Sequence, residues 1–260
     1  MQAVAVASSL LLAAGCSRNQ AETRPAHGVS YLLDWKKSKV EEAAGAGWEV
    51  TNDLGYRVHV SHGYLVTRSL ELIPCNPVPP PVSLLDRLDD VIGPRRAYAG
   101  HSAIADPSAT KNAEVESLLS PQSHYAATLY PGAQTYCQAH YLIARADRQA
   151  TGLPTEVDLV DQSLRIEGWF RQPGQAQEQS FTVVTAVANG RLFDLPRAAS
   201  HEAFALDTAS ESGVVVVRRD LDTIFDHVDF SVMNDKRIGR EVLQNLINAT
   251  EIELRVNHDG

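Results

Sequence analysis

The feature that most constrains the fold of this chain is a long run of alternating residues from Tyr56 to Ile73. Successive side chains of a β-strand point to opposite faces, so the alternation predicts a long strand with one face on a core and one in water. Gly63 interrupts the run, and we expect a bulge or a bend between two strands there. The predicted core face comprises Tyr56, Val58, Val60, His62, Tyr64, Val66, Leu70 and Leu72.

Shorter segments with the same period occur along the rest of the chain and predict further strands. They lie at Tyr31–Trp35, Tyr136–Ala144, Leu164–Phe170, Phe181–Ala188, Leu192–Leu195, Ala203–Leu206, Val214–Arg218 and Ile252–Val256. Gln172–Gln175 predicts the turn of a hairpin between the third and fourth of these. Many short strands separated by turn residues indicate a mainly β protein, folded as an antiparallel β-sandwich or barrel-like domain with a few short peripheral helices.

Helical spacing of apolar residues is limited to a few segments. A helix is predicted at Ser83–Ile92, where Ser83 and Asp86 form a capping-box pattern. A helical turn is expected at Ala113–Leu119, and helices are expected at Leu221–Val228 and Ile238–Ile247.

The N-terminus predicts export. Residues 3–15 carry no charge and are too few to span a bilayer, which takes ~20 apolar residues, but they match the apolar region of a signal peptide. They lead into Leu12-Ala13-Ala14-Gly15-Cys16, which resembles the lipobox of bacterial lipoproteins. The resemblance implies cleavage before Cys16, lipid on its thiol and, because Ser17 follows, an outer-membrane lipoprotein facing the periplasm or the cell surface. An ordinary secretory signal is the alternative, and an upstream start codon would explain the missing basic residues after Met1.

The predicted organisation follows from this leader. Residues 1–15 are the signal peptide, and the polar, aperiodic residues 16–28 are a flexible tether. Residues 29–260 form a single β-rich domain, or two sub-lobes at 29–150 and 151–260.

The net charge and the number of cysteines limit the kinds of partner and compartment that we expect. The formal net charge is −9, which argues against nucleic acid as a partner because phosphate binding needs clustered Lys and Arg. The chain has three cysteines, and with Cys16 on the lipid, Cys75 and Cys137 remain. Two cysteines in an oxidising compartment most simply form one disulfide. A metal-thiolate site is the alternative for this pair.

No catalytic motif stands out. The chain has no Gly-x-Ser-x-Gly, His-Glu-x-x-His, phosphate-binding glycine loop or dinucleotide fingerprint. The sequence therefore predicts a protein that is not an enzyme, and a hydrolase remains only the third hypothesis.

The nine histidines are candidate metal ligands. His62 falls on the predicted core face, where its ring is either hydrogen-bonded to the backbone or bound to a metal. His101 and His124 lie on predicted loops between the two cysteine-bearing strands, so we expect that they could join His62 in a site for copper or zinc. His59 lies three positions before His62, so the two face opposite sides of the strand unless it bulges.

The order of the predicted elements resembles the MbnP-like periplasmic proteins, which are copper-associated. The resemblance rests on Tyr64-Leu65-Val66, Leu70-Glu71-Leu72, Ile166-Glu167-Gly168 and the segment from Val216 to Phe225. The chain lacks the four-cysteine motif common in that group. The sequence predicts a lipid-anchored envelope binding protein, with copper or zinc as its expected ligand. A structural lipoprotein that binds another envelope protein and no metal is the alternative.

Overall fold

A computed structural model describes residues 27–43, 47–76, 106–119, 121–195 and 205–257. The lipidation site Cys16, the predicted helix at 83–92 and His101 lie outside these residues. The last two residues of the predicted tether are described, and the His27 backbone N–H donates to the Thr208 carbonyl at 3.0 Å. No helix of the described chain is long and apolar enough to cross a membrane.

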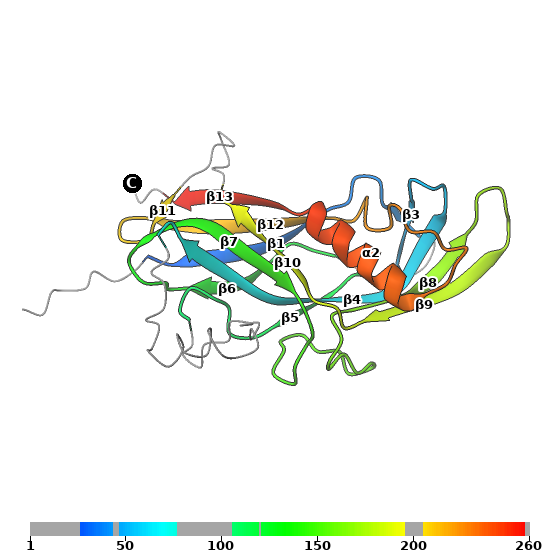
Figure 1. Cartoon of the computed structure of the whole chain (residues 1–260), viewed down its shortest axis with the longest axis horizontal. Helices are drawn as coiled ribbons and strands as arrows, with labels where there is room; N and C mark the ends of the chain where they lie inside the picture. The colour runs from blue at the N-terminus through cyan, green and yellow to red at the C-terminus, as the bar shows by residue number, and fades with distance from the viewer. Residues whose placement is uncertain (1–26, 44–46, 77–105, 120, 196–204, 258–260) are drawn as a thin grey trace, which may run out of the picture.

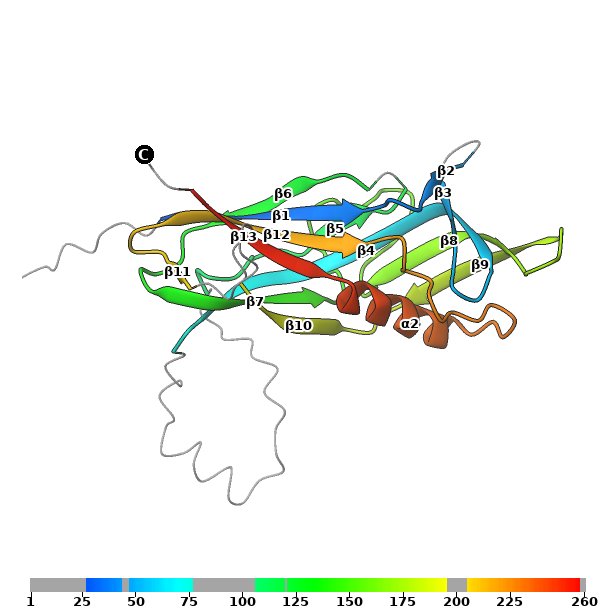
Figure 2. The same ribbon diagram turned by 90° about the horizontal axis from the view of Figure 1, so that it is seen from above.

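The strands form two sheets, as the alternation predicts (Figures 1 and 2). The small sheet has the order β13 (Glu251–Asn257), β12 (Ser212–Asp220), β1 (Val29–Lys36) and β6 (His124–Leu129). The large sheet has the order β10 (Asn189–Asp194), β7 (Thr135–Ile143), β4 (Arg57–Pro74), β3 (Trp48–Thr51) and β2 (Glu41–Glu42). It also contains β5 (Glu114–Ser117), β8 (Leu164–Arg171), β9 (Glu178–Thr185) and β11 (Leu206–Asp207).

The mainly β prediction is confirmed, and the two sheets do not close into a barrel. Among the named strands β1 and β12 pair in parallel, and every other pairing is antiparallel. Both sheets combine strands from either side of residue 150. The predicted hairpin is β8 and β9, whose turn is closed by a hydrogen bond from the Gln175 N–H to the Gln172 carbonyl at 3.0 Å.

Two of the predicted helical segments are wrong. Residues 113–119 contain strand β5, not a helical turn. Leu221–Val228 forms consecutive turns, such as that closed by the Val228 N–H on the Phe225 carbonyl at 3.1 Å. The apolar residues of these turns are nevertheless buried. Their spacing therefore reflects packing of their side chains in the core and not a helix.

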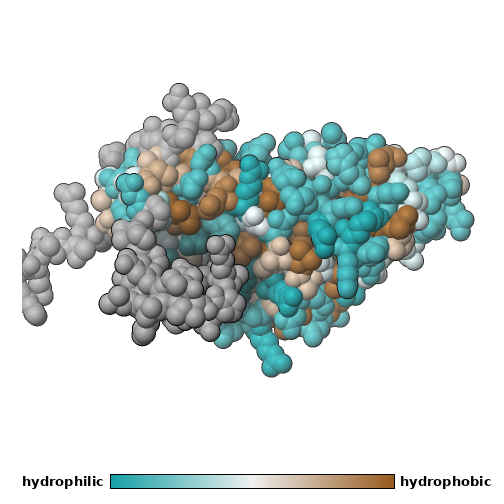
Figure 3. Space-filling model, viewed as in Figure 1, coloured by the Kyte–Doolittle hydropathy of each residue, from teal (hydrophilic) through white to brown (hydrophobic). Residues whose placement is uncertain are grey.

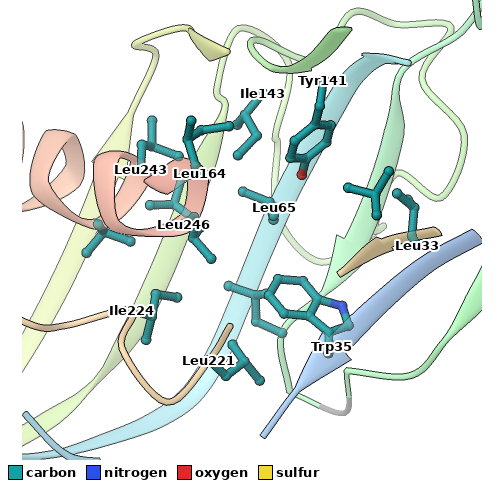
Figure 4. Close-up of a cluster of buried hydrophobic side chains, with 14 of the residues drawn as sticks. Leu33, Trp35, Leu65, Tyr141, Ile143, Leu164, Leu221, Ile224, Leu243 and Leu246 are labelled. Atoms are coloured by element: carbon teal, nitrogen blue, oxygen red, sulfur yellow. The ribbon is translucent and has the colours of Figure 1, made fainter. Parts of the chain in front are cut away.

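The third predicted helix is confirmed as α2 (Asp235–Asn248). Asn234 caps it, because its side-chain oxygen accepts from the Arg237 N–H at 3.0 Å. The apolar face of α2 packs against β9 and completes a core to which both sheets contribute. Figure 4 shows buried side chains from the two sheets, the turns and α2 meeting in this core.

The long strand β4 changes face twice, which the simple alternation does not predict. Its pairing shifts by one residue between Val60 and His62, and again between Thr67 and Ser69. Each shift is a β-bulge that moves the following side chains to the other face. The β4 residues that pack in the main core are therefore even before the first bulge, odd after it at Leu65, and even again from Leu70.

A disulfide joins Cys75, directly after β4, to Cys137 of β7, as predicted. The Cα atoms are 4.9 Å apart, and the two residues are 62 apart in the sequence. Disulfides persist in oxidising environments, so the bond indicates an extracytoplasmic location. The face of the molecule in Figure 3 is largely hydrophilic, with apolar side chains in scattered patches.

Candidate functional site

The candidate site is built around the first bulge of β4. Val60 pairs with Gly168, and His62 pairs with Glu167, so Ser61 is an extra residue between two consecutive partners on β8. The Ser61 hydroxyl donates to the Glu167 carbonyl at 3.2 Å and fixes the bulge. A Cβ atom on Gly168 would lie only 1.8 Å from the His59 carbonyl oxygen, so this approach of the two backbones requires glycine.

The bulge places His59 and His62 on the same face of the large sheet. His59 pairs with Trp169 and His62 with Glu167, and these two partners are two positions apart on β8. Residues two apart on a strand share a face. We call the face turned away from the core along these strands the β4–β8 seam. It comprises the cross-strand pairs Arg57–Arg171, His59–Trp169, His62–Glu167 and Tyr64–Arg165.

His59 is the buried member of the histidine pair. It is 9% exposed, and its ring stacks on Trp169 with centroids 5.0 Å apart and planes 10° apart. Its Nδ1 atom is buried without a hydrogen bond and lies 3.7 Å from Glu49 Oε1. The Glu49 carboxylate is itself bound by the Arg57 guanidinium. The sequence does not predict His59 as a ligand together with His62, because their shared face depends on the bulge.

His62 is exposed and lines a pocket of about 190 Å³ on the seam. The prediction that His62 lies on the buried apolar face is wrong, because the bulge reverses the alternation directly before it. Its side chain has no hydrogen bond or ion pair among the described residues. The pocket is lined by His62, Gly63, Tyr64, Glu156, Val157, Arg165 and Glu167.

The other charged groups of the pocket are paired. Arg165 binds Glu167 through Nη2 at 2.5 Å and Nε at 2.7 Å. The Tyr64 hydroxyl donates to the Glu156 carboxylate. Burial and this carboxylate together raise the pKa of Tyr64 to about 12, while the same hydrogen bond lowers the pKa of Glu156. Tyr64 therefore stays protonated at neutral pH and acts as a donor.

The three predicted metal ligands are not brought together in the described residues. His62 lies on the large sheet, whereas His124 begins β6 of the small sheet, 3.7 Å from Glu114 Oε1. His101 lies outside the described chain. Across the residues that the structure describes, no group of three or more His, Cys, Asp or Glu side chains is arranged to hold a metal ion.

The pocket presents several charged and hydrogen-bonding groups. Its lining offers an imidazole, two carboxylates and a guanidinium, groups that can hold a small polar or charged ligand. The only hydroxyl is that of Tyr64, which its raised pKa keeps neutral. No protein-family model, curated protein or solved structure matches the chain.

Proposed function

We propose that this chain is a lipid-anchored, non-enzymatic binding protein of the cell envelope, with its binding site on the β4–β8 seam. The observation that carries the proposal is the pocket on the seam, where the His62 imidazole has no partner among the described residues. The Cys75–Cys137 disulfide supports an oxidising compartment. The lipobox-like residues before Cys16 support anchoring at the outer membrane, towards the periplasm or the cell surface.

The shape of the molecule suits an anchor at one end. Strand β1 begins at the same end of the elongated molecule as the C-terminus of the described chain, whereas the β8–β9 hairpin turn lies at the opposite end (Figures 1 and 2). A lipid on Cys16 would attach this end of the molecule to the membrane through the predicted flexible tether.

Acylation can be tested on the full chain expressed in a Gram-negative host. We expect incorporation of labelled palmitate, a mature N-terminus at Cys16 and recovery in the outer-membrane fraction. The Cys16→Ala variant should incorporate no label and retain its leader. Unlabelled protein in the cytosolic fraction would contradict the proposal.

The binding site can be tested by filling the pocket. We expect native mass spectrometry of protein extracted from the envelope to detect a bound small ligand or metal ion. Val157→Trp should displace it by occupying the pocket, whereas Val232→Trp, at an exposed position outside the pocket, should not. An adduct that survives Val157→Trp, or is absent from the unaltered protein, would contradict the proposed site.

A second candidate function, binding to another envelope protein, is favoured by one edge of the small sheet. Tyr125 and Tyr130, in and just after edge strand β6, are 66% and 69% exposed, and no residue between them is charged. The opposite edge strand, β13, carries Glu251, Glu253 and Arg255, charges of the kind that protect sheet edges. A photo-crosslinking amino acid at Tyr125 should capture a specific envelope protein if this candidate is correct, and none if it is not.

A further inference from the structure

We propose that His59 and His62 together bind a divalent transition-metal ion on the β4–β8 seam, with copper(II) bound more tightly than zinc. This inference rests on the proposed binding function and names its ligand class. It replaces the set His62, His101 and His124 expected from the sequence with a pair that the bulge creates.

The first argument is position. Because Ser61 is the extra residue of the bulge, His59 and His62 take adjacent positions on one face, like residues two apart on a regular strand. Such positions lie roughly 6.6 Å apart along the strand. Two imidazoles at that spacing can converge on one ion, since each metal–nitrogen bond is about 2 Å long.

The second argument is the orientation of His59. A metal-binding histidine typically donates its other ring N–H to a carboxylate, which fixes the tautomer. Nδ1 of the buried His59 ring has no hydrogen-bond partner but faces Glu49 Oε1 at 3.7 Å. A metal ion on Nε2 would hold the proton on Nδ1, and a small rotation of the ring would complete the hydrogen bond to Glu49. The ion thus satisfies a polar atom that is otherwise buried unpaired.

The third argument is the freedom of His62. The exposed His62 side chain breaks no hydrogen bond when it turns towards the ion. Glu49 and Glu167, which flank the two histidines, are each paired with an arginine, Arg57 and Arg165, so the inference rests on the two imidazole ligands and not on local charge.

The protein supplies two nitrogen ligands in this arrangement, and water completes the coordination. Imidazole and oxygen ligands suit copper(II), and the Irving–Williams order places copper(II) above zinc for such a set.

Trp169 provides the readout. Its ring stacks on His59 at 5.0 Å, so copper(II) on His59 should quench its fluorescence. We would titrate the lipidated full chain in detergent with copper(II) sulfate, and follow the emission that is lost in a Trp169→Phe variant. Electron paramagnetic resonance of the copper should show nitrogen ligands. Zinc sulfate should compete only at higher concentration.

His59→Phe keeps a ring against Trp169, and His62→Gln changes an exposed side chain, so the second variant stays informative if the first fails to fold. We expect each to weaken copper(II) binding at least tenfold. The matched controls His124→Gln and His140→Gln should bind as the unaltered protein does. Equal affinity in His62→Gln, or copper binding that leaves Trp169 unquenched, would overturn the inference. Either result would leave the proposed acylation and export untouched. Conversely, a protein that binds copper at this pair but is not acylated would refute only the proposed membrane anchor.

Discussion

Arg219 of β12 and Glu116 of β5 form a buried, bidentate ion pair that links the small sheet to the large one. The Nη1–Oε1 distance is 2.5 Å and the Nη2–Oε2 distance is 2.6 Å, and the side chains are 0% and 3% exposed. The guanidinium also lies 4.0 Å from the centre of the Trp35 ring. Burial alone would lower the pKa of Arg219, but the Glu116 carboxylate outweighs it and raises the pKa.

Removing one partner of this pair should destabilise the protein strongly. Arg219→Met leaves the Glu116 carboxylate buried with Thr67 Oγ1, at 3.0 Å, as its one remaining donor among the described residues. We expect the free energy of unfolding to fall by about 3–5 kcal/mol, as measured by urea denaturation. The double variant Arg219→Met/Glu116→Leu should recover most of this loss, because neither charge remains. A double variant no more stable than the single one would show that the loss comes from packing.

The bulge that forms the candidate site should depend on Gly168. In Gly168→Ala, the new Cβ would lie 1.8 Å from the His59 carbonyl oxygen, so β4 and β8 must separate. We expect a loss of about 2–4 kcal/mol in stability and weaker stacking of Trp169 on His59, visible in the tryptophan near-ultraviolet circular dichroism.

Gly132→Ala is the matched control for this substitution. A Cβ at Gly132 meets no atom within 4 Å, and we expect a change of less than about 0.5 kcal/mol. Equal stability of the two variants would mean that the strands tolerate a side chain at position 168.

The sequence predicts elements whose pattern is local. The alternation of β4, β8 and β9 and the helical spacing of α2 appear within short windows, and their existence is confirmed. Strand β5 does not show this alternation, because the carboxylate of Glu116 is buried beside the apolar Val115. The Glu116 carboxylate is stable in the interior because Arg219, from a distant strand, pairs with it.

The candidate site can be predicted only in part, because it too depends on residues from strands that are distant in the sequence. The sequence singles out His62, but the environment of its side chain depends on a bulge that Gly168, on another strand, makes possible. The side chains of Glu156 and Val157 reach the pocket from the segment before β8, and no periodicity marks them. Lipidation of Cys16 stays a prediction.

Breaking the disulfide should destabilise the fold without abolishing its topology. The bond closes a loop between residues 62 apart, which corresponds to about 4 kcal/mol in the chain-entropy description. We expect the Cys75→Ser/Cys137→Ser variant to unfold at a lower urea concentration and to match the reduced unaltered protein. A double variant as stable as the oxidised protein would contradict this prediction.

The acid stability of the protein should depend on Asp229. Its carboxylate accepts from the Tyr56 hydroxyl at 2.6 Å and from the Ser231 N–H at 2.8 Å, and these bonds lower its pKa from 3.8 to about 2. A carboxylate whose pKa is lower in the folded state contributes stability above its unfolded pKa. That contribution is lost as the pH falls from about 4 to about 2.

The urea midpoint of the unaltered protein should therefore exceed that of Asp229→Asn at pH 6, and the two should converge towards pH 2. Tyr56→Phe keeps the ring contacts with Phe170 and Phe230 but removes the hydroxyl donor. In that variant the pKa of Asp229 should rise towards its ordinary value, so convergence should occur at higher pH. A difference between the unaltered protein and Asp229→Asn that stays constant over this range would show that the contribution of Asp229 does not come from its charge.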